Sequence, residues 1–151
     1  MPVEQKLKEM GLELPVSPKP LANYVTVVKT GNLLFLSGHL PTREGKVQYA
    51  GKLGRDLGVE DGYQAARIAA LNCLASLKSE VGDLDKVRRV VKVVGFVNSA
   101  EGFTDQPKVV NGASDLLAEA FGEVGRHARS AVGVSELPAN AAVEVEMIVE
   151  V

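Results

Sequence analysis

The sequence predicts an α+β fold in the order β-β-α-β-α-β-β, with a mixed sheet that carries two helices on one face. Two observations lead to this prediction. Short β-branched and alternating segments lie at both ends of the chain, and two longer segments between them space their apolar residues like helices. A chain of 151 residues is long enough for one real core, so residues 1–151 are expected to form a single domain.

Residues 1–20 predict a short helix followed by an extended lead-in. Val3, Leu7 and Met10 are spaced to share one face of a helix. Three prolines then favour extended backbone, because each proline restricts both its own conformation and that of the residue before it. They are Pro15, Pro18 and Pro20.

A β-hairpin is expected next. Tyr24–Lys29 and Leu33–Ser37 have strand composition, and Gly31 with Asn32 supplies a turn between them. The segment Arg43–Gly58 is rich in glycine and reads as a loop, with one short strand at Lys46–Tyr49.

The clearest helix is predicted for Val59–Val81, with Gly82 as its C-terminal stop. Val87–Val97 is strongly β-branched and predicts a strand. A second helix is expected to begin at Thr104 or Asp105, to carry Pro107 in its first turn and to end at Gly122.

The C-terminal part predicts two more strands, Arg129–Ser135 and Ala142–Val151, joined by a turn at Leu137–Asn140. We expect these strands to be neighbours in a hairpin. The last strand alternates strictly, so Glu144 and Glu146 share one of its faces.

The sheet is also expected to have apolar residues on the face that the helices leave open. Leu33–Leu36 and Val87–Val97 are apolar in both alternating sets of positions, whereas two helices can cover one face only. A partner subunit would bury the remaining apolar area. The alternative is that loops of the same chain cover it.

Composition restricts the class of protein. The net charge of −2 and the lack of tryptophan argue against a nucleic-acid partner. Because Cys73 is the single cysteine, no intramolecular disulfide can form, and a reducing, cytoplasmic location is expected. No signal peptide or membrane-spanning apolar run is recognisable. Two histidines and one cysteine, far apart, predict no metal site.

Arg129 is the best candidate for a binding residue. The next residues on its face, Ala131 and Gly133, are small and leave room beside the guanidinium, which is suited to bidentate capture of a carboxylate. Glu144 or Glu146 on the expected neighbouring strand could orient a water molecule. The alternative is a surface ion pair between Arg129 and one of these glutamates. No phosphate-binding loop, dinucleotide fingerprint or nucleophile elbow is present.

These residues occur within a set of motifs that resembles the RidA (YjgF-like) family of enamine/imine deaminases, from about Tyr24 to the C-terminus. The longer loop before the helix Val59–Val81 resembles that of a less-studied branch of the family, whose members are described as having a chorismate mutase-like fold. The segments that carry the resemblance are Leu36-Ser37-Gly38-His39-Leu40-Pro41, Val93 to Val97, Asn111, Ala128-Arg129-Ser130-Ala131-Val132, Leu137-Pro138 and Val143-Glu144-Val145-Glu146.

The resemblance implies a homotrimer whose three sheets form a central barrel, with small-molecule sites in clefts between subunits. It implies that Arg129 binds a substrate carboxylate and that Glu144 positions the hydrolytic water. The reaction would be cofactor-free hydrolysis of 2-imino or 2-enamino acids to 2-oxo acids and ammonia. The residues implied to line the pocket are Tyr24, Ser37 and Asn111, with Gly38 and Ala131 assisting through their backbone.

The sequence departs from that family pattern at several positions. Ala131 replaces a usual thiol, His39 replaces a usual glutamine, and Ala22-Asn23 replaces a usual Gly-Pro. His39 could act as an acid or base in the pocket or serve as a polar lining residue. Two other functions therefore stay open: a non-catalytic protein that binds a small carboxylate metabolite, and, with less support, an endoribonuclease.

Overall fold

The computed structural model describes residues 1–17 and 23–151, and its main feature is a five-stranded mixed sheet. The strand order across the sheet is β1-β2-β7-β5-β6. Only the β5–β6 pair is parallel; the other neighbours are antiparallel. The strands are β1 (Val27–Thr30), β2 (Leu33–Leu36), β5 (Arg89–Asn98), β6 (Ala128–Val134) and β7 (Val143–Glu150).

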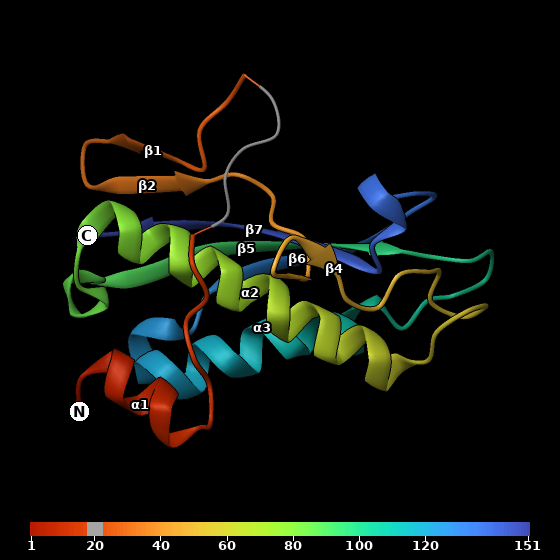
Figure 1. Cartoon of the computed structure of the whole chain (residues 1–151), viewed down its shortest axis with the longest axis horizontal. Coiled ribbons are helices and arrows are strands. Elements are labelled where there is room, and N and C mark those ends of the chain that lie inside the picture. Colours follow the sequence, from red (N-terminus) through yellow and green to blue (C-terminus); the bar gives the residue numbers. More distant parts are fainter. Residues whose placement is uncertain (18–22) are drawn as a thin grey trace.

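Two long helices cover one face of this sheet, as Figure 1 shows, and confirm the predicted α+β fold. They are α2 (Val59–Val81) and α3 (Gln106–Phe121). Around them the chain adds α1 (Val3–Glu9), a small hairpin of β3 (Thr42–Arg43) and β4 (Lys46–Val47), and three 3₁₀ turns. The turns are Leu84–Lys86, Gly122–Gly125 and Pro138–Asn140.

Several predicted boundaries agree with the structure within one or two residues. The helix Val59–Val81 is confirmed at both ends, and the short N-terminal helix is confirmed as α1. The extended backbone predicted at Pro18 and Pro20 lies outside the described residues. Asp105 is the N-cap residue of α3, although its side chain makes no capping hydrogen bond.

The strand predicted at Tyr24–Lys29 is displaced. It begins only at Val27 and continues to Thr30, which pairs with Leu33 across the two-residue turn. Gly31 has φ +59° in this turn, a conformation that glycine adopts without strain. The turn therefore sets the pairing, and Tyr24 lies before the strand.

The predicted hairpin of the last two strands is wrong. β5 lies between β6 and β7 and pairs with both. The cause is the crossover through α3: a strand, a helix and a second strand form a βαβ unit, whose two strands lie parallel and adjacent. Arg129 on β6 is consequently not next to the glutamates of β7.

The core lies between the sheet and the helices, and its tightest point is the contact of α2 with α3. A Cβ atom built on Gly112 would lie 2.0 Å from the backbone oxygen of Tyr63, so the two helix backbones touch where glycine is the only residue that fits. Cys73 is fully buried on α2, and burial raises the pKa of its thiol. Cys73 is therefore part of the packed core and not an exposed thiol.

The opposite face of the sheet has no helix and presents apolar side chains. Val28, Phe35 and Val132 are among the large hydrophobic residues that remain exposed. The strand pairing places Phe35 beside Ile148, and Val132 beside Phe96. This surface, called the open face below, confirms the expected apolar excess on the uncovered side.

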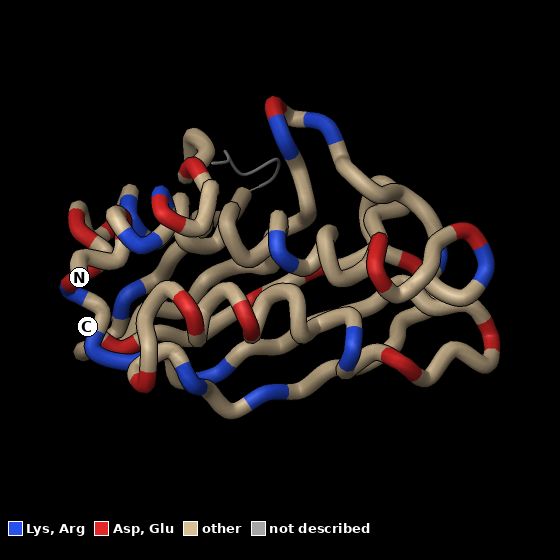
Figure 2. Tube along the Cα trace, turned by 90° about the horizontal axis from the view of Figure 1, so that it is seen from below, with Lys and Arg blue, Asp and Glu red and all other residues tan. Residues whose placement is uncertain are grey.

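Charges are distributed without a dominant sign. Basic and acidic residues are interspersed over the trace in Figure 2, consistent with a net charge of −2. Among the described residues, no helix combines the length and the apolarity needed to cross a membrane.

Candidate functional site

Arg129 lies on the helix-covered side of β6 and reaches α3. Its Nη1 donates to Asn111 Oδ1 at 2.9 Å and to Ser114 Oγ at 3.2 Å, and its Nη2 donates to the backbone oxygen of Pro107 at 3.4 Å. His127 bonds to the same Ser114 hydroxyl. We call Asn111, Ser114, His127 and Arg129 the arginine cluster.

The partners of Arg129 are all neutral. Among the described residues, no carboxylate lies within ion-pair distance of the guanidinium. A guanidinium has five N–H donors, and the three bonds leave the Nε–H and one Nη2–H without a partner in the described part of the chain. The alternative prediction of an internal Arg129–glutamate pair is therefore wrong.

A second group of residues lies on the open face. Glu144 and Glu146 share this face, as predicted, because the intervening Val145 points to the core and is fully buried. Glu144 lies against Gly38: a Cβ atom at residue 38 would be 2.5 Å from Glu144 Oε2. We call Ser37, Gly38, Glu144 and Glu146 the glutamate cluster.

The environment of Glu144 disfavours its charge. Burial raises the pKa of the Glu144 carboxyl above its ordinary value, and repulsion from Glu146 adds to the increase. A carboxylate with a raised pKa is a stronger base than an exposed one and can accept a proton from water more readily.

This environment predicts that Glu144→Gln stabilises the chain at neutral pH. Because the pKa of Glu144 is higher in the folded chain than in the unfolded chain, ionisation of Glu144 lowers the free energy of unfolding. The contribution of Glu144 to stability is therefore most favourable below the unfolded-state pKa and declines as pH rises through the folded-state pKa. Glutamine stays neutral throughout. We expect the melting temperature at pH 7 to rise by less than about 4 °C, the shift that ~1 kcal/mol produces in a domain of this size.

The measurement is thermal unfolding of the wild-type protein and of Glu144→Gln at pH 4 and at pH 7. The gain should be small at pH 4, where Glu144 is largely protonated. Glu150→Gln is the matched control, because it removes a carboxylate from the same face of the same strand, at the strand end. An equal gain at both pH values would contradict the electrostatic explanation.

His39 belongs to the core rather than to an open surface. It is 4% exposed, and its ring nitrogens bond to the backbone oxygen of Ser37 at 2.6 Å and to Ser76 Oγ at 2.8 Å. Because a carbonyl oxygen can only accept, Nδ1 carries the proton and Nε2 accepts from Ser76. Burial lowers the pKa of His39. The histidine thus fastens the Gly38 turn to α2.

The remaining predicted residues fall beside one cluster or the other. Ser37 donates its hydroxyl to the backbone oxygen of Val25 at 2.7 Å, and Tyr24, just before Val25, is 48% exposed. Ala131 pairs with the buried Gly95 and lies on the same side of β6 as Arg129.

The two clusters lie on opposite faces of the sheet. Arg129 pairs with Val93, and Val93 pairs with Met147, whose side chain is buried under the helices. Glu144 is three residues from Met147 on the same strand and therefore points the other way. Within one chain, Arg129 and Glu144 cannot contact the same small ligand.

Ser114 and His127 are the residues of this region that the sequence reasoning missed. Ser114 lies one helical turn after Asn111, a spacing that places both on one face of a helix. His127 is two residues before Arg129, a spacing that places both on one side of an extended segment. These two spacings were available from the sequence.

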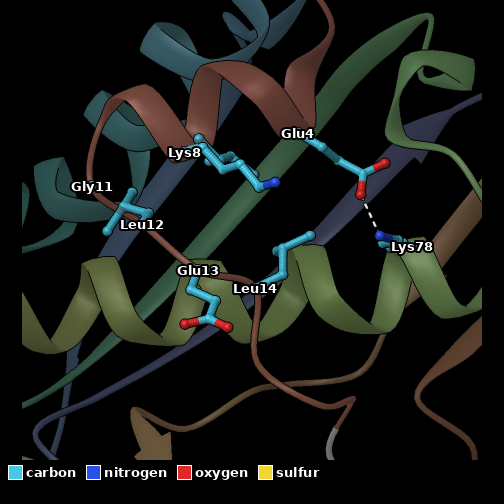
Figure 3. Close-up of a pocket in the computed structure, with 8 residues that line it drawn as sticks. Glu4, Lys8, Gly11, Leu12, Glu13, Leu14 and Lys78 are labelled. Atoms are coloured by element: carbon cyan, nitrogen blue, oxygen red, sulfur yellow. Dashed lines mark hydrogen bonds and ion pairs between the residues drawn. The ribbon is translucent and has the colours of Figure 1, made fainter.

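A surface hollow of about 440 Å³ lies between α1 and α2, apart from both clusters (Figure 3). Glu4 and Lys78 form an ion pair in it and join the two helices. Neither Arg129 nor Glu144 lines this hollow, so it is not the predicted site.

Comparisons with known proteins cover nearly the whole chain. A family model described as "YjgF/chorismate mutase-like, putative endoribonuclease" matches residues 4–151. Protein TCP17 from Trypanosoma cruzi is 48% identical over 149 residues, which are 98% of this chain and 93% of that protein.

Two further matches carry names that suggest activities. A protein from Dermatophagoides farinae named "2-iminobutanoate/2-iminopropanoate deaminase" is 32% identical over 138 residues, which are 91% of this chain and 93% of that protein. The crystal structure of a "putative endoribonuclease" from Shewanella oneidensis has a TM-score of 0.97 and 38% identity, and the match covers 100% of both chains.

Proposed function

Because this chain belongs to the YjgF/chorismate mutase-like family, we propose that it hydrolyses reactive 2-imino and 2-enamino acids to 2-oxo acids and ammonia. The observation that carries the proposal is the Arg129 guanidinium, which neutral groups hold while the Nε–H and one Nη2–H keep no partner in the described residues. Two parallel N–H donors match a carboxylate. The relative named as an iminobutanoate deaminase supports the same choice of substrate.

The reaction needs little from the protein beyond binding and positioning. Arg129 would bind the substrate carboxylate and place the electrophilic C=N carbon next to a water molecule held by Glu144. Water adds to that carbon as Glu144 accepts one proton. Glu144 passes this proton to the nitrogen, which gives a carbinolamine. The hydroxyl proton of the carbinolamine then moves to the nitrogen, the C–N bond breaks, and ammonia leaves as the C=O bond forms. An enamino acid would enter as its imino tautomer, and no cofactor takes part.

Assembly is part of the proposal, because one chain separates the two groups. We propose a homotrimer in which the open faces turn inward and the arginine cluster of one subunit meets the glutamate cluster of the next. Burial of the exposed Val28, Phe35 and Val132 would stabilise such an assembly. A closed threefold arrangement gives every subunit the same contacts.

The proposed cleft assigns a role to each predicted residue. Asn111 and Ala131 would line the side of Arg129, whereas Tyr24, Ser37 and Gly38 would line the side of Glu144. Gly38 leaves the space that the Glu144 carboxylate occupies. His39 would support the Gly38 turn from beneath. The proposed location of the trimer is the cytosol, where a single cysteine stays reduced.

The test is hydrolysis of 2-iminobutanoate generated in place by a threonine dehydratase. Release of 2-oxobutanoate would be followed with lactate dehydrogenase in excess, under conditions where spontaneous hydrolysis of the imine limits the rate. We expect the purified protein to increase the rate in proportion to its concentration. Release no faster than in buffer alone would reject the proposed activity.

The same preparation tests the other two functions. Stabilisation of the protein by 2-oxobutanoate without turnover would assign a non-catalytic carboxylate-binding protein. RNA cleavage that is lost in Arg129 and Glu144 variants would assign an endoribonuclease. The mixed charges along the trace (Figure 2) argue against the latter function, because RNA binding uses clustered basic residues.

A further inference from the structure

The hydrogen bonds around Arg129 continue in one direction to His127. His127 Nδ1 lies 2.7 Å from the backbone oxygen of Gly125, which can only accept, so Nδ1 carries the proton of the neutral ring. Nε2 must then accept, and its partner at 2.8 Å is the Ser114 hydroxyl. Ser114 Oγ donates its proton to His127 and keeps its lone pairs for Arg129 Nη1.

This chain of bonds sets the orientation of the guanidinium. Asn111 and Ser114 take both Nη1–H groups from the α3 side, which turns the Nε–H and one Nη2–H away from the helix. Ser114 Oγ has two lone pairs, so it can accept from Arg129 Nη1 while it donates to neutral His127 and also when a protonated Nε2 donates to it. The imidazole thus acts on Arg129 through the serine.

Arg129 also interacts electrostatically with His127. Burial lowers the pKa of His127, and the Arg129 charge lowers it further, against a bond to Gly125 that raises it. Three charged residues close to this cluster in the sequence have partners of their own. Glu123 and Arg126 on the preceding turn face each other at 3.6 Å, and on α3 Asp115 accepts from the hydroxyl of Tyr63 at 2.7 Å.

We propose that Ser114 and His127 are positioning residues that hold Arg129 toward its ligand, and that protonation of His127 strengthens the binding of an anion at Arg129. This inference rests on the proposed function, since it takes the ligand to be a small carboxylate. A bound carboxylate offsets the repulsion between His127 and Arg129, so binding the anion and binding the proton favour each other.

The first measurement needs no ligand. The chain has two histidines, so imidazole NMR signals can be assigned with a His127→Gln variant. We expect Arg129→Met to raise the pKa of His127 by about 0.5 to 1 pH unit, the effect of one charge several ångströms away at intermediate dielectric. Arg126→Met, which removes an equal but exposed charge next to His127, should change it by much less. Equal effects of the two variants would overturn the proposed coupling.

The second measurement uses 2-oxobutanoate. Bound 2-oxobutanoate should raise the pKa of His127 by a similar amount and leave the NMR signals of the buried His39 unchanged. Its affinity should be about 3 to 10 times higher below the pKa of His127 than above it, because linkage makes the pKa shift and the change in affinity one quantity. Ser114→Ala should weaken binding several-fold, and Ser114→Thr should restore it. His127→Gln keeps a hydrogen-bond acceptor and a donor at residue 127. This variant should bind 2-oxobutanoate with an affinity that does not change across the pKa of His127.

The two proposals can fail separately. Imine hydrolysis and 2-oxobutanoate binding with no response at His127 would overturn the positioning role and leave the proposed function standing. Binding with the expected response but no hydrolysis would reject the deaminase and retain the role of His127. If 2-oxobutanoate does not bind, the proposed anion site at Arg129 fails, and the coupling to His127 with it.

Discussion

Replacing Arg129 by alanine is expected to lower imine hydrolysis by about 10²–10³-fold, the loss of two charge-assisted hydrogen bonds to the substrate. The side chain binds the carboxylate in both the ground and the transition state, so the loss should fall mainly on kcat/KM. The dehydratase-coupled assay at low imine supply measures this ratio directly.

Two controls separate binding from folding. Arg126→Ala removes an exposed arginine that pairs only with Glu123 in the described residues and should retain full activity. Arg129→Lys keeps the positive charge but loses the pair of parallel N–H donors, so it should have only part of the wild-type activity. An Arg129→Ala protein with wild-type kcat/KM would remove the basis of the proposed function.

The largest effect on stability is expected from Gly112→Ala. The added Cβ would lie 2.0 Å from the backbone oxygen of Tyr63, and a backbone group in a packed helix cannot move aside as a flexible side chain can. Alanine gains about 1 kcal/mol of helix propensity, but separation of α2 from α3 outweighs that gain. We expect a net loss of roughly 2–4 kcal/mol, or about 5–15 °C in melting temperature.

Gly62→Ala is the matched comparison. Gly62 is also helical, but its Cβ would meet side-chain atoms of Leu53 and Val109 at 2.9 Å, which can shift to accommodate it. The same propensity gain applies, so the loss should be under about 1 kcal/mol. If thermal unfolding ranked the two variants in the opposite order, the helix contact would not be the tight point of the core.

Local patterns in the sequence account for most of the fold. The helix Val59–Val81 was predictable at both ends because its apolar spacing is regular and Gly82 ends it. The apolar residues on both sides of Val87–Val97 indicated a sheet with an open face, and the structure shows that face exposed.

The position of β6 was not predicted, because strand neighbours depend on contacts between distant segments. The short connection at Leu137–Asn140 resembled a hairpin turn and suggested that β6 and β7 pair. The strand-helix-strand succession of β5, α3 and β6 was the better guide, since such units place their strands in parallel. A strand that is apolar on both faces also belongs in the middle of a sheet.

The sequence suggests residues for the candidate site, but it does not give their arrangement. Arg129 and Glu144 were identifiable, yet their separation by the sheet follows from the strand order alone. Ser114 was missed because a serine inside a helix is usually exposed or bonds to its own backbone. Its role depends on Arg129 and His127, which approach it only in the folded chain.

The placement of Arg129 and Glu144 on opposite sides of the sheet has a consequence for assemblies that contain two different variants of the chain. If each site takes its arginine from one protomer and its glutamate from the next, two inactive parents carry complementary defects. Unfolding a mixture of Arg129→Ala and Glu144→Gln chains and refolding them together would then regenerate about a quarter of the sites with both groups intact. The refolded mixture would then be more active than either of the two samples from which it was made.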